Sequence, residues 1–416
     1  MPHIESLHRA LYRWYEQYHR VLPWRETDDP YKIWLSEIIL QQTRVVQGME
    51  YYLRFTERFP DVATLADADE DEVLRYWQGL GYYSRARNLH KAAKMIVAQG
   101  WLPFPSTFEQ IRQLPGVGDY TAGAIASFAY NRPYPAMDGN VYRVVSRLYD
   151  CDIAFDTNAG KKHFHHLIDD LLDRQNARLF NSSIMEFGAL YCTPSLSLLG
   201  SDEPSCPHCP LAAFCLANLH HTADLLPVRK PRPALRDRYL NYFICLCPTS
   251  TMANSTPTGD NTLPATTVAS AYCTLLHKRT NKDIWQHLYE FPLIETDHLF
   301  DTAEATQALH TAAQPISVVQ NTAKDTTKDN TEDNTEGTTK DTTKDTTEGT
   351  TQTPNIPVLD FTHILSHQRL HARFFCVQVS ALPTIGDTIA VSLSDLDQYA
   401  LSRLTLRALE KLQLLS

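Results

Sequence analysis

The chain has 416 residues, and at about 150 residues per domain this length predicts two to three domains and excludes a single small module. Hydrophobic residues make up 43% and charged residues 21% of the chain, and no run of about 18 apolar residues occurs, so we expect no membrane-spanning segment. A formal net charge of −10 disfavours, by itself, a nucleic-acid partner, because phosphate binding usually leaves a basic surface.

The negative charge is unevenly distributed along the chain. Residues 321–353 contain four lysines against eight acidic residues, a net charge of −4 in one stretch. This stretch and a second one at about 249–264 are rich in polar residues, so both are predicted to be solvated inserts without fixed structure. The overall charge is therefore a poor guide to the partners of the other segments.

The first 225 residues are predicted to be mainly helical. The N-terminal twenty residues mix charged and apolar side chains without a signal-peptide pattern, so we expect a mature helix and a cytoplasmic protein. Asp29 and Pro30 predict the start of a helix in which Trp34, Ile38 and Val45 keep helical spacing. Further helical patterns cover residues 61–77, 84–98, 106–113, 119–130, 141–149, 159–173 and 177–190.

A proline-rich basic segment at residues 226–236 is predicted to be a linker between two domains. The residue pattern changes after it, and runs of β-branched and aromatic residues predict strands at 239–247, 268–278 and 373–379. Helical patterns follow at 301–312 and 393–414. Residues 237–416 are therefore predicted to form an α+β domain.

The motif LPGVG at residues 114–118 lies between two helical patterns. Gly116 and Gly118 permit a tight turn whose backbone N–H groups, together with the dipole of the following helix, form a seat for a phosphate. This pattern is typical of a helix-hairpin-helix motif over about 111–125. An ordinary turn between two helices is the alternative.

Two carboxylates are candidates for chemistry. Glu37 lies in the segment SEIILQQT, among apolar neighbours that would raise the pKa of a carboxyl into the range of a general acid. A solvated or ion-paired glutamate is the alternative interpretation. Asp138 and Asn140, in the segment MDGNVYRV, directly precede a helix, and either residue can be its N-cap. One cap suffices, which leaves the other residue available.

Four cysteines crowd into a short segment, and the intervals between Cys192, Cys206, Cys209 and Cys215 contain thirteen, two and five residues. This crowding favours metal ligation over a disulfide framework. Four thiolates can hold either Zn²⁺ or a [4Fe-4S] cluster, and composition does not separate the two. The five other cysteines are expected to be small apolar residues of the core.

The segments SEIILQQT, LPGVG and MDGNVYRV, followed by the cysteine cluster, together resemble the MutY family of adenine DNA glycosylases, within the helix-hairpin-helix glycosylase superfamily. The resemblance covers residues 1 to about 230 closely and the C-terminal half more weakly. It implies a mainly α catalytic region of 1–225 with an iron-sulfur module at 192–215, and a Nudix-like α+β domain of 237–416. It also implies a monomer that removes adenine opposite 8-oxoguanine or guanine in double-stranded DNA.

The resemblance assigns a role to each candidate catalytic residue. Glu37 matches the general acid that protonates N7 of adenine, and Asp138 matches the carboxylate that stabilises or captures the oxocarbenium ion. Asn140 and Tyr120 match supporting polar groups. Bifunctional relatives carry a Schiff-base lysine at the position of Tyr120, so we expect a monofunctional glycosylase with at most weak strand cleavage.

The resemblance also assigns DNA-contacting and cluster-binding residues. Extrusion of a base from the stack costs a few kcal/mol, and wedge residues help to offset this cost. The residues implied are the wedges Gln42 and Tyr82, the adenine-pocket residues Trp24 and Arg25, the lesion-reading residues Ser366 and His367, and the [4Fe-4S] ligands Cys192, Cys206, Cys209 and Cys215.

Three positions depart from the family pattern. Leu365 replaces the phenylalanine expected beside Ser366, and Ser182 replaces a glutamine or glutamate near the adenine. The interval after Cys192 has thirteen residues where six are usual, and an inserted loop explains this simply because closure entropy grows slowly with loop length.

Two other functions fit parts of this pattern. A thymine or uracil mismatch glycosylase of the same superfamily is one, although Glu37 and the C-terminal motifs weigh against it. A protein that binds damaged DNA without cleaving it, or a zinc-stabilised helical DNA-binding module, is the other. The presence of both Glu37 and Asp138 weighs against a binding-only protein.

Overall fold

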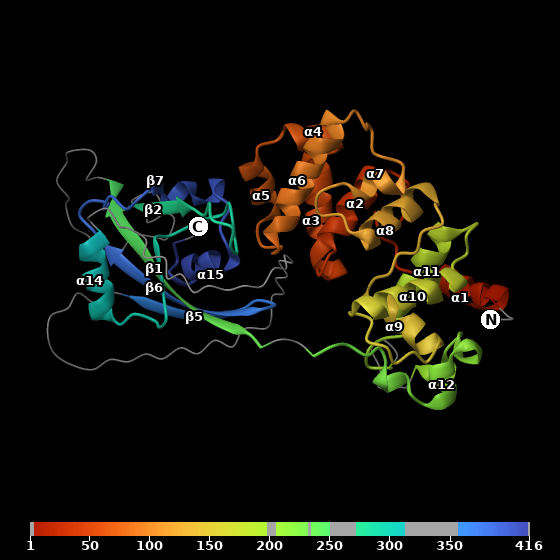
Figure 1. The fold of residues 1–416 in the computed structure, drawn as a ribbon. Coiled ribbons are helices and arrows are strands. Elements are labelled where there is room, and N and C mark those ends of the chain that lie inside the picture. Colours follow the sequence, from red (N-terminus) through yellow and green to blue (C-terminus); the bar gives the residue numbers. More distant parts are fainter. Residues whose placement is uncertain (1–3, 198–204, 232–233, 250–271, 313–356, 415–416) are drawn as a thin grey trace. The chain divides into compact units, whose positions relative to one another are not determined.

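The computed structural model describes residues 4–197, 205–231, 234–249, 272–312 and 357–414 (Figure 1). The predicted insert at 321–353 and nearly all of the one at 249–264 lie outside these residues. The contacts divide the chain into two compact units. The first unit comprises Met1–Asp67 and Asn88–Arg232, and the second comprises Ala68–Arg87 and Pro233–Ser416. Among the described residues, no helix is long and apolar enough to cross a membrane.

The first unit is built from helices, as predicted. Asp29 caps α2 by accepting hydrogen bonds from the backbone N–H groups of Tyr31 and Lys32, and Pro30 occupies the first helical position. The helices that lie in this unit are α1 (Ile4–Tyr18), α2 (Pro30–Ile39), α3 (Val45–Arg58), α4 (Val62–Asp67), α7 (Phe108–Arg112), α8 (Asp119–Tyr130), α9 (Gly139–Leu148), α10 (Asn158–Leu171), α11 (Ala177–Leu190) and α12 (Leu216–His220). Helix α6 (Tyr83–Ala98) has residues in both units.

Two features of the first unit position the candidate site. Helix α2 has eight of its ten residues buried, as expected for a central helix that is apolar on all sides. A hydrophobic core joins α1, α9, α10 and α11 through residues such as Leu11, Val144, Phe164 and Phe187. Both α2 and α9 are therefore held firmly by packing, and polar side chains on them have fixed positions.

The helix predicted over 61–77 is in fact two helices, α4 and α5 (Glu70–Trp77). Asp69 takes an extended conformation with φ −70° and ψ 143°, and three acidic residues follow it in the first turn of α5, where the helix dipole favours them. The break coincides with the start of Ala68–Arg87, which groups with the C-terminal unit. The grouping therefore differs from the single boundary predicted at 226–236, because α5 bonds to strands that follow the linker.

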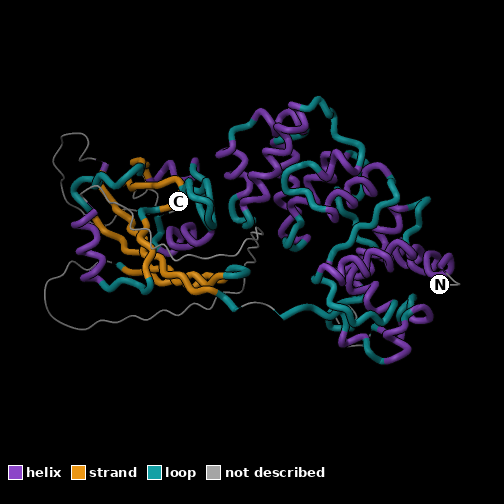
Figure 2. Tube along the Cα trace, in the orientation of Figure 1, coloured by secondary structure: helices purple, strands orange, loops and turns teal. Residues whose placement is uncertain are grey.

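The second unit contains a sheet of seven strands (Figure 2). Its strands are β1 (Arg236–Pro248), β2 (Tyr272–Lys278), β3 (Tyr289–Glu290), β4 (Leu293–Thr296), β5 (Val358–Ile364), β6 (Gln368–Gln378) and β7 (Ile389–Ser392). Their order is β3-β2-β1-β6-β5, with β4 paired to β1 and β7 paired to β2. The central pair β1 and β6 is parallel, whereas β5 and β6 form an antiparallel hairpin. Helices α14 (Thr302–Ala312) and α15 (Arg403–Lys411) complete the α+β unit.

The predicted strands are only partly correct. β1 and β2 confirm the runs from 239 and from 272, while residues 268–271 lie outside the described part of the chain. β6 begins at Gln368, five residues earlier than predicted, because it pairs with β1 along its whole length and with β5 over residues 369–375. β5 is not among the predicted strands, although buried Phe361 and His363 alternate with Asp360 and Thr362, which is the pattern of a half-buried strand.

Candidate active site and cysteine pocket

Glu37 lies inside the first unit, on the central helix α2, with 8% of its surface exposed. The hydroxyl of Tyr120, on α8, donates a hydrogen bond of 2.8 Å to its Oε2. Burial raises the pKa of Glu37 to about 7, and the charge of Asp138 also raises it, while the bond from Tyr120 and the charge of Arg25 act in the opposite direction. Glu37 is thus a buried carboxyl able to hold a proton near neutral pH.

Asp138 is the N-cap of α9. Its Oδ1 accepts from the backbone N–H of Val141 at 2.8 Å, and its Oδ2 accepts from the side-chain amide of Asn140 at 2.7 Å. Burial raises the pKa of Asp138, and these two bonds oppose the rise because they stabilise the ionised form. Of the two residues predicted as alternative caps, Asp138 is the cap and Asn140 is its partner.

The two residues predicted to line an adenine pocket differ in their surroundings. The guanidinium of Arg25 lies 5.5 Å from the ring centroid of Phe128 and donates to the carbonyl oxygen of Ser182 at 3.4 Å. Its positive charge lowers the pKa of Glu37. Trp24 is 5% exposed and packs edge-on against Tyr52 at 5.1 Å. Arg25 therefore belongs to the carboxyl site, whereas Trp24 is part of the core beside it.

Arg143 is a site residue that the sequence reasoning missed. It is buried on α9, donates from Nη2 to Asn140 Oδ1 at 2.8 Å, and donates from Nε to the carbonyl oxygen of Cys192 at 2.7 Å. One turn later, Arg147 Nη1 lies 3.2 Å from Cys192 Sγ. Hydrogen bonds therefore connect Asp138 to the first cysteine. Two arginines four residues apart, on the face of α9 opposite Val141, Val145 and Leu148, were the available signal.

The hairpin at 114–118 joins α7 to α8. Gly116 has φ +78°, and a Cβ there would lie 2.9 Å from Asn88 Cβ, so both the backbone conformation and the space require glycine. Gly118 precedes the first residue of α8 with φ −91°, and nothing lies within 4 Å of a Cβ built on it. Both glycines are exposed, and the absence of a side chain at Gly118 leaves the N-terminus of α8 open to a ligand.

The predicted wedge residues share an unusual backbone conformation. Gln42 follows α2 with φ +56° and is exposed, and Tyr82 follows α5 with φ +50° and is 7% exposed. A positive φ is uncommon for residues other than glycine, and such residues cluster at functional sites. Gln42 belongs to the first unit and Tyr82 to the second.

The predicted lesion-reading loop is shorter than expected. Residues 361–364 belong to β5, and only Leu365, Ser366 and His367 form the turn to β6, closed by a bond of 2.8 Å from Leu365 N to Gln368 O. Leu365 is 4% exposed, Ser366 is half-buried and His367 is exposed. The leucine that replaces the expected phenylalanine is therefore packed inside, and the two polar residues are presented outward.

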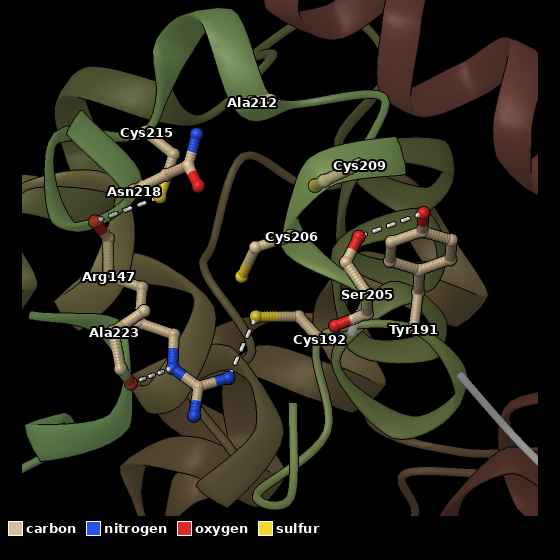
Figure 3. A pocket seen from close by; sticks show the side chains of 10 residues that line it. All are labelled: Arg147, Tyr191, Cys192, Ser205, Cys206, Cys209, Ala212, Cys215, Asn218 and Ala223. Atoms are coloured by element: carbon tan, nitrogen blue, oxygen red, sulfur yellow. Dashed lines mark hydrogen bonds between the residues drawn. The ribbon is translucent and has the colours of Figure 1, made fainter. Parts of the chain in front are cut away.

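The four clustered cysteines line one pocket in the first unit (Figure 3). The sulfur atoms of Cys192 and Cys206 point toward each other across it. Burial, with a contribution from the neighbouring sulfurs, raises the pKa of the Cys209 thiol to about 12 and that of Cys215 to about 11. A cationic group is needed to hold these sulfurs as thiolates, which are the ligand form.

The lining of the cysteine pocket combines sulfur atoms with a cationic side chain. In the described part of the chain, no three His, Cys, Asp or Glu side chains are grouped so that they could hold one metal ion. The pocket offers instead four sulfur donors together with the arginine Arg147. Of the other cysteines, Cys151, Cys245 and Cys247 are buried, and Cys273 and Cys376 are half-buried.

Comparison with known proteins identifies both halves of the chain. Residues 35–167 match the HhH-GPD superfamily of base excision DNA repair proteins, and residues 267–411 match the NUDIX domain. The helix-hairpin-helix fold and the Nudix-like α+β domain are thereby confirmed. Among solved structures, a thermostable thymine-DNA glycosylase is similar with a TM-score of 0.46 and 24% identity, over 52% of this chain and 97% of that one.

Curated relatives are adenine DNA glycosylases. The protein of Buchnera aphidicola subsp. Baizongia pistaciae is 32% identical over 286 residues, which are 68% of this chain and 73% of the relative. The protein of Mus musculus is 37% identical over 257 residues, 59% of this chain and about half of the relative, 48%. With a helix-hairpin-helix unit, a Nudix-like unit and a relative matched over nearly three quarters of its length, the chain belongs to the adenine DNA glycosylase family of base excision repair.

Proposed function

We propose that this protein hydrolyses the N-glycosidic bond of adenine paired with 8-oxoguanine or guanine, and that Glu37 and Asp138 carry out the reaction. The observation that supports this most directly is a carboxyl with a pKa of about 7, hydrogen-bonded by Tyr120 and coupled electrostatically to a second carboxyl. Two carboxyl groups with different environments are the usual means by which one site supplies both an acid and a charge stabiliser.

The steps follow from the protonation states. Protonated Glu37 transfers its proton to N7 of adenine, and the bond between C1′ and N9 then breaks with its electron pair leaving on the neutral base. The sugar becomes an oxocarbenium ion, which the carboxylate of Asp138 stabilises electrostatically or captures at C1′. Water adds to C1′ and loses a proton to complete the hydrolysis.

Two neighbours act as positioning residues in this proposal. The hydroxyl of Tyr120 orients Glu37, and the amide of Asn140 keeps Asp138 ionised by donating to Oδ2. Tyr120 carries no amine, so a Schiff base with the sugar does not form at this position. The product is an abasic site on an intact strand.

The DNA-contacting roles rest on the exposure of Gly116, Gly118 and Gln42 and on the positive φ of Gln42 and Tyr82. We assign the backbone N–H groups around Gly116 and Gly118 to a phosphate, and Gln42 and Tyr82 to the gap left by the extruded base. Arg25 contacts the adenine, and the turn of Ser366 and His367 reads the opposite base through hydrogen bonds that distinguish 8-oxoguanine from guanine.

The cysteine pocket is assigned to a [4Fe-4S] cluster. Four sulfur donors line it, and four thiolates are the ligand set of such a cluster. The cluster supplies the positive charge that holds Cys192, Cys206, Cys209 and Cys215 as thiolates. Its ligand Cys192 is tied to α9 through Arg143 and Arg147, so the cluster stabilises the helix that Asp138 caps.

The oligomeric state and location complete the proposal. We propose further that the protein acts as a monomer on double-stranded DNA. Free cysteines throughout the described residues suit a reducing compartment, which supports the predicted cytoplasmic location.

Single-turnover base excision tests the proposed chemistry. On a duplex with adenine opposite 8-oxoguanine, Glu37→Gln and Asp138→Asn should each lower the rate by at least about a hundredfold, the range for loss of acid–base or electrostatic catalysis. Tyr12→Phe, which removes a hydroxyl bonded to Asp173 elsewhere in the unit, is a matched control and should excise at the wild-type rate.

Further measurements distinguish this mechanism from the alternative functions and the cluster from zinc. Undiminished excision by either carboxyl variant would refute the mechanism. Faster excision from thymine or uracil mispairs than from adenine pairs would favour the mismatch glycosylase instead. Iron and sulfide analysis distinguishes the cluster from zinc, since a cluster gives about four irons per chain.

A further inference from the structure

The loop between α5 and α6 that carries Tyr82 has a demanding conformation. Gly79 and Gly81 have φ +91° and +77°, and Tyr82 itself has φ +50°. A residue with a Cβ in this conformation is disfavoured by about 1–2 kcal/mol and persists only where its surroundings hold it in place. What holds this loop therefore bears on the function of Tyr82.

Part of the support comes from the loop and its flanking helices. The Arg85 guanidinium lies 5.1 Å from the ring centroids of both Trp77 and Tyr82. It also donates to the carbonyl oxygen of Gly81 at 3.1 Å, and Trp77 Nε1 donates to the same oxygen at 2.9 Å. The ring of Tyr82 is thus stacked on a cation that is itself fixed to the loop.

Further support comes from residues far along the chain, in the same compact unit. Just before the loop, Gln78 Oε1 accepts from the backbone N–H of Leu401 at 2.9 Å. Just after it, Tyr83 donates to the carbonyl oxygen of Leu401 at 3.3 Å, and Arg87 Nη1 donates to that of Gln286 at 2.7 Å. The Nudix-like unit therefore binds the loop on both sides of Tyr82.

An ionic contact fixes the preceding helix to the same unit. In the first turn of α5, Asp71 accepts from Lys278 Nζ at 2.5 Å and from the Tyr289 hydroxyl at 3.2 Å. Beside it, Glu70 is bonded to His287 Nδ1. The side chains of Asp71 and Lys278 are 39% and 36% exposed, so this pair is partly shielded from water. It is therefore worth more than a fully exposed ion pair.

We infer that the Nudix-like unit, besides reading the opposite base, is the support that positions the Tyr82 loop for insertion into the DNA stack. The inference rests on the proposed wedge role of Tyr82 and the proposed reading role of Ser366 and His367. All three belong to the same compact unit, so recognition of 8-oxoguanine and unstacking at Tyr82 act together. Pre-positioning of both groups spares the ordering of a free loop on binding.

Charge exchange at Asp71 and Lys278 tests this inference. Asp71→Lys and Lys278→Asp each place like charges together and should slow single-turnover excision opposite 8-oxoguanine by about tenfold, a loss of roughly 1.4 kcal/mol. Their combination restores an ion pair and should recover most of the rate. Fluorescence of 2-aminopurine placed beside the lesion should show the same loss and recovery of unstacking.

Two further variants guard against trivial explanations. Arg403→Glu disrupts the exposed Arg403–Glu410 pair of the same unit, so it is the matched control and should excise at the wild-type rate. Gln78→Ala removes the bond to Leu401 and should slow excision and reduce unstacking without lowering the melting temperature by more than a few degrees.

The outcomes distinguish this inference from the proposed function. If Tyr82→Ala excises at the wild-type rate, Tyr82 is no wedge and both proposals about it are wrong. If Tyr82→Ala is slow while Gln78→Ala and the folded charge reversals keep the wild-type rate and unstacking signal, only the supporting role of the Nudix-like unit is overturned.

Discussion

Glu37 shows how a single residue acquires its chemistry from its neighbours. An isolated glutamate is ionised at neutral pH, but this one lies on a helix with apolar packing on all sides, and burial raises its pKa to about 7. Tyr120 and Arg25 keep the pKa from rising further. The balance leaves an acid that is protonated in a large fraction of molecules near pH 7, where it can still release its proton.

The pH dependence of excision follows from this balance. The rate of base release should fall as pH rises through about 7, because Glu37 must be protonated to donate. It should also fall in acid, because Asp138 must be ionised and burial raises its pKa above the usual aspartate value. Single-turnover rates measured from pH 5 to pH 9 should give a bell. Glu37→Gln should lose the alkaline limb, and an unchanged limb in that variant would assign it to another group.

At the scale of elements, helix ends carry the candidate functions. Asp138 caps α9, and its charge also raises the pKa of Glu37. One carboxylate therefore stabilises the helix and belongs to the candidate site. The start of α8 is open at Gly118 and its preceding turn requires glycine at 116. Glycine therefore suits the two positions of this motif for different physical reasons.

This difference predicts different effects of alanine at the two positions. Gly116→Ala should destabilise the protein by about 1–2 kcal/mol, since it combines a positive φ with a contact of 2.9 Å to Asn88. Gly118→Ala should leave the melting temperature nearly unchanged, yet weaken DNA binding, because its methyl group would stand between the backbone and a phosphate. Thermal unfolding and fluorescence anisotropy with a labelled duplex measure the two effects. Equal destabilisation by both variants would contradict this account.

At the scale of the molecule, the proposed functions are divided between two compact units. The segment Ala68–Arg87 lies early in the sequence but belongs to the second unit. The proposed excision chemistry lies in the first unit, on α2, α8 and α9. The proposed reading turn and the proposed Tyr82 wedge lie in the second. Selectivity for 8-oxoguanine is therefore expected to depend on residues that do not contribute to bond cleavage.

Substitution of the reading turn tests this division. Ser366→Ala combined with His367→Ala should lower excision opposite 8-oxoguanine much more than excision opposite guanine, because the hydrogen bonds lost are those that distinguish the two bases. The ratio of single-turnover rates on the two duplexes measures the effect. A proportional loss on both duplexes would mean that the turn contributes general binding only. Lys282→Ala, at an exposed position of the same unit, is a suitable control.

Local signals were sufficient for much of the fold. Helix α11 was predicted at its observed bounds and α8 likewise, because the residues that form each helix and those that interrupt it are neighbours in the sequence. The strand β5 was missed although polar and apolar residues alternate along it, because the residues from 361 onward resemble a loop of the family and the pairing with β6 is a tertiary contact. Arg143 was missed because its partners, Asn140 and the carbonyl oxygen of Cys192, include one from a distant segment.

The sequence by itself determined which segments are mainly helical, where the hairpin lies, and which cysteines cluster. It also determined that Glu37 and Asp138 belong to motifs that occur in the same order as in the family. These features depend on neighbouring residues and on spacing. Only the tertiary structure decided that Glu37 is buried beside Tyr120, that Asp138 rather than Asn140 is the cap, and that Trp24 belongs to the core. It also decided that Ala68–Arg87 packs with the Nudix-like unit. Burial and long-range contacts arise from packing of segments distant in the chain, and no local pattern records them.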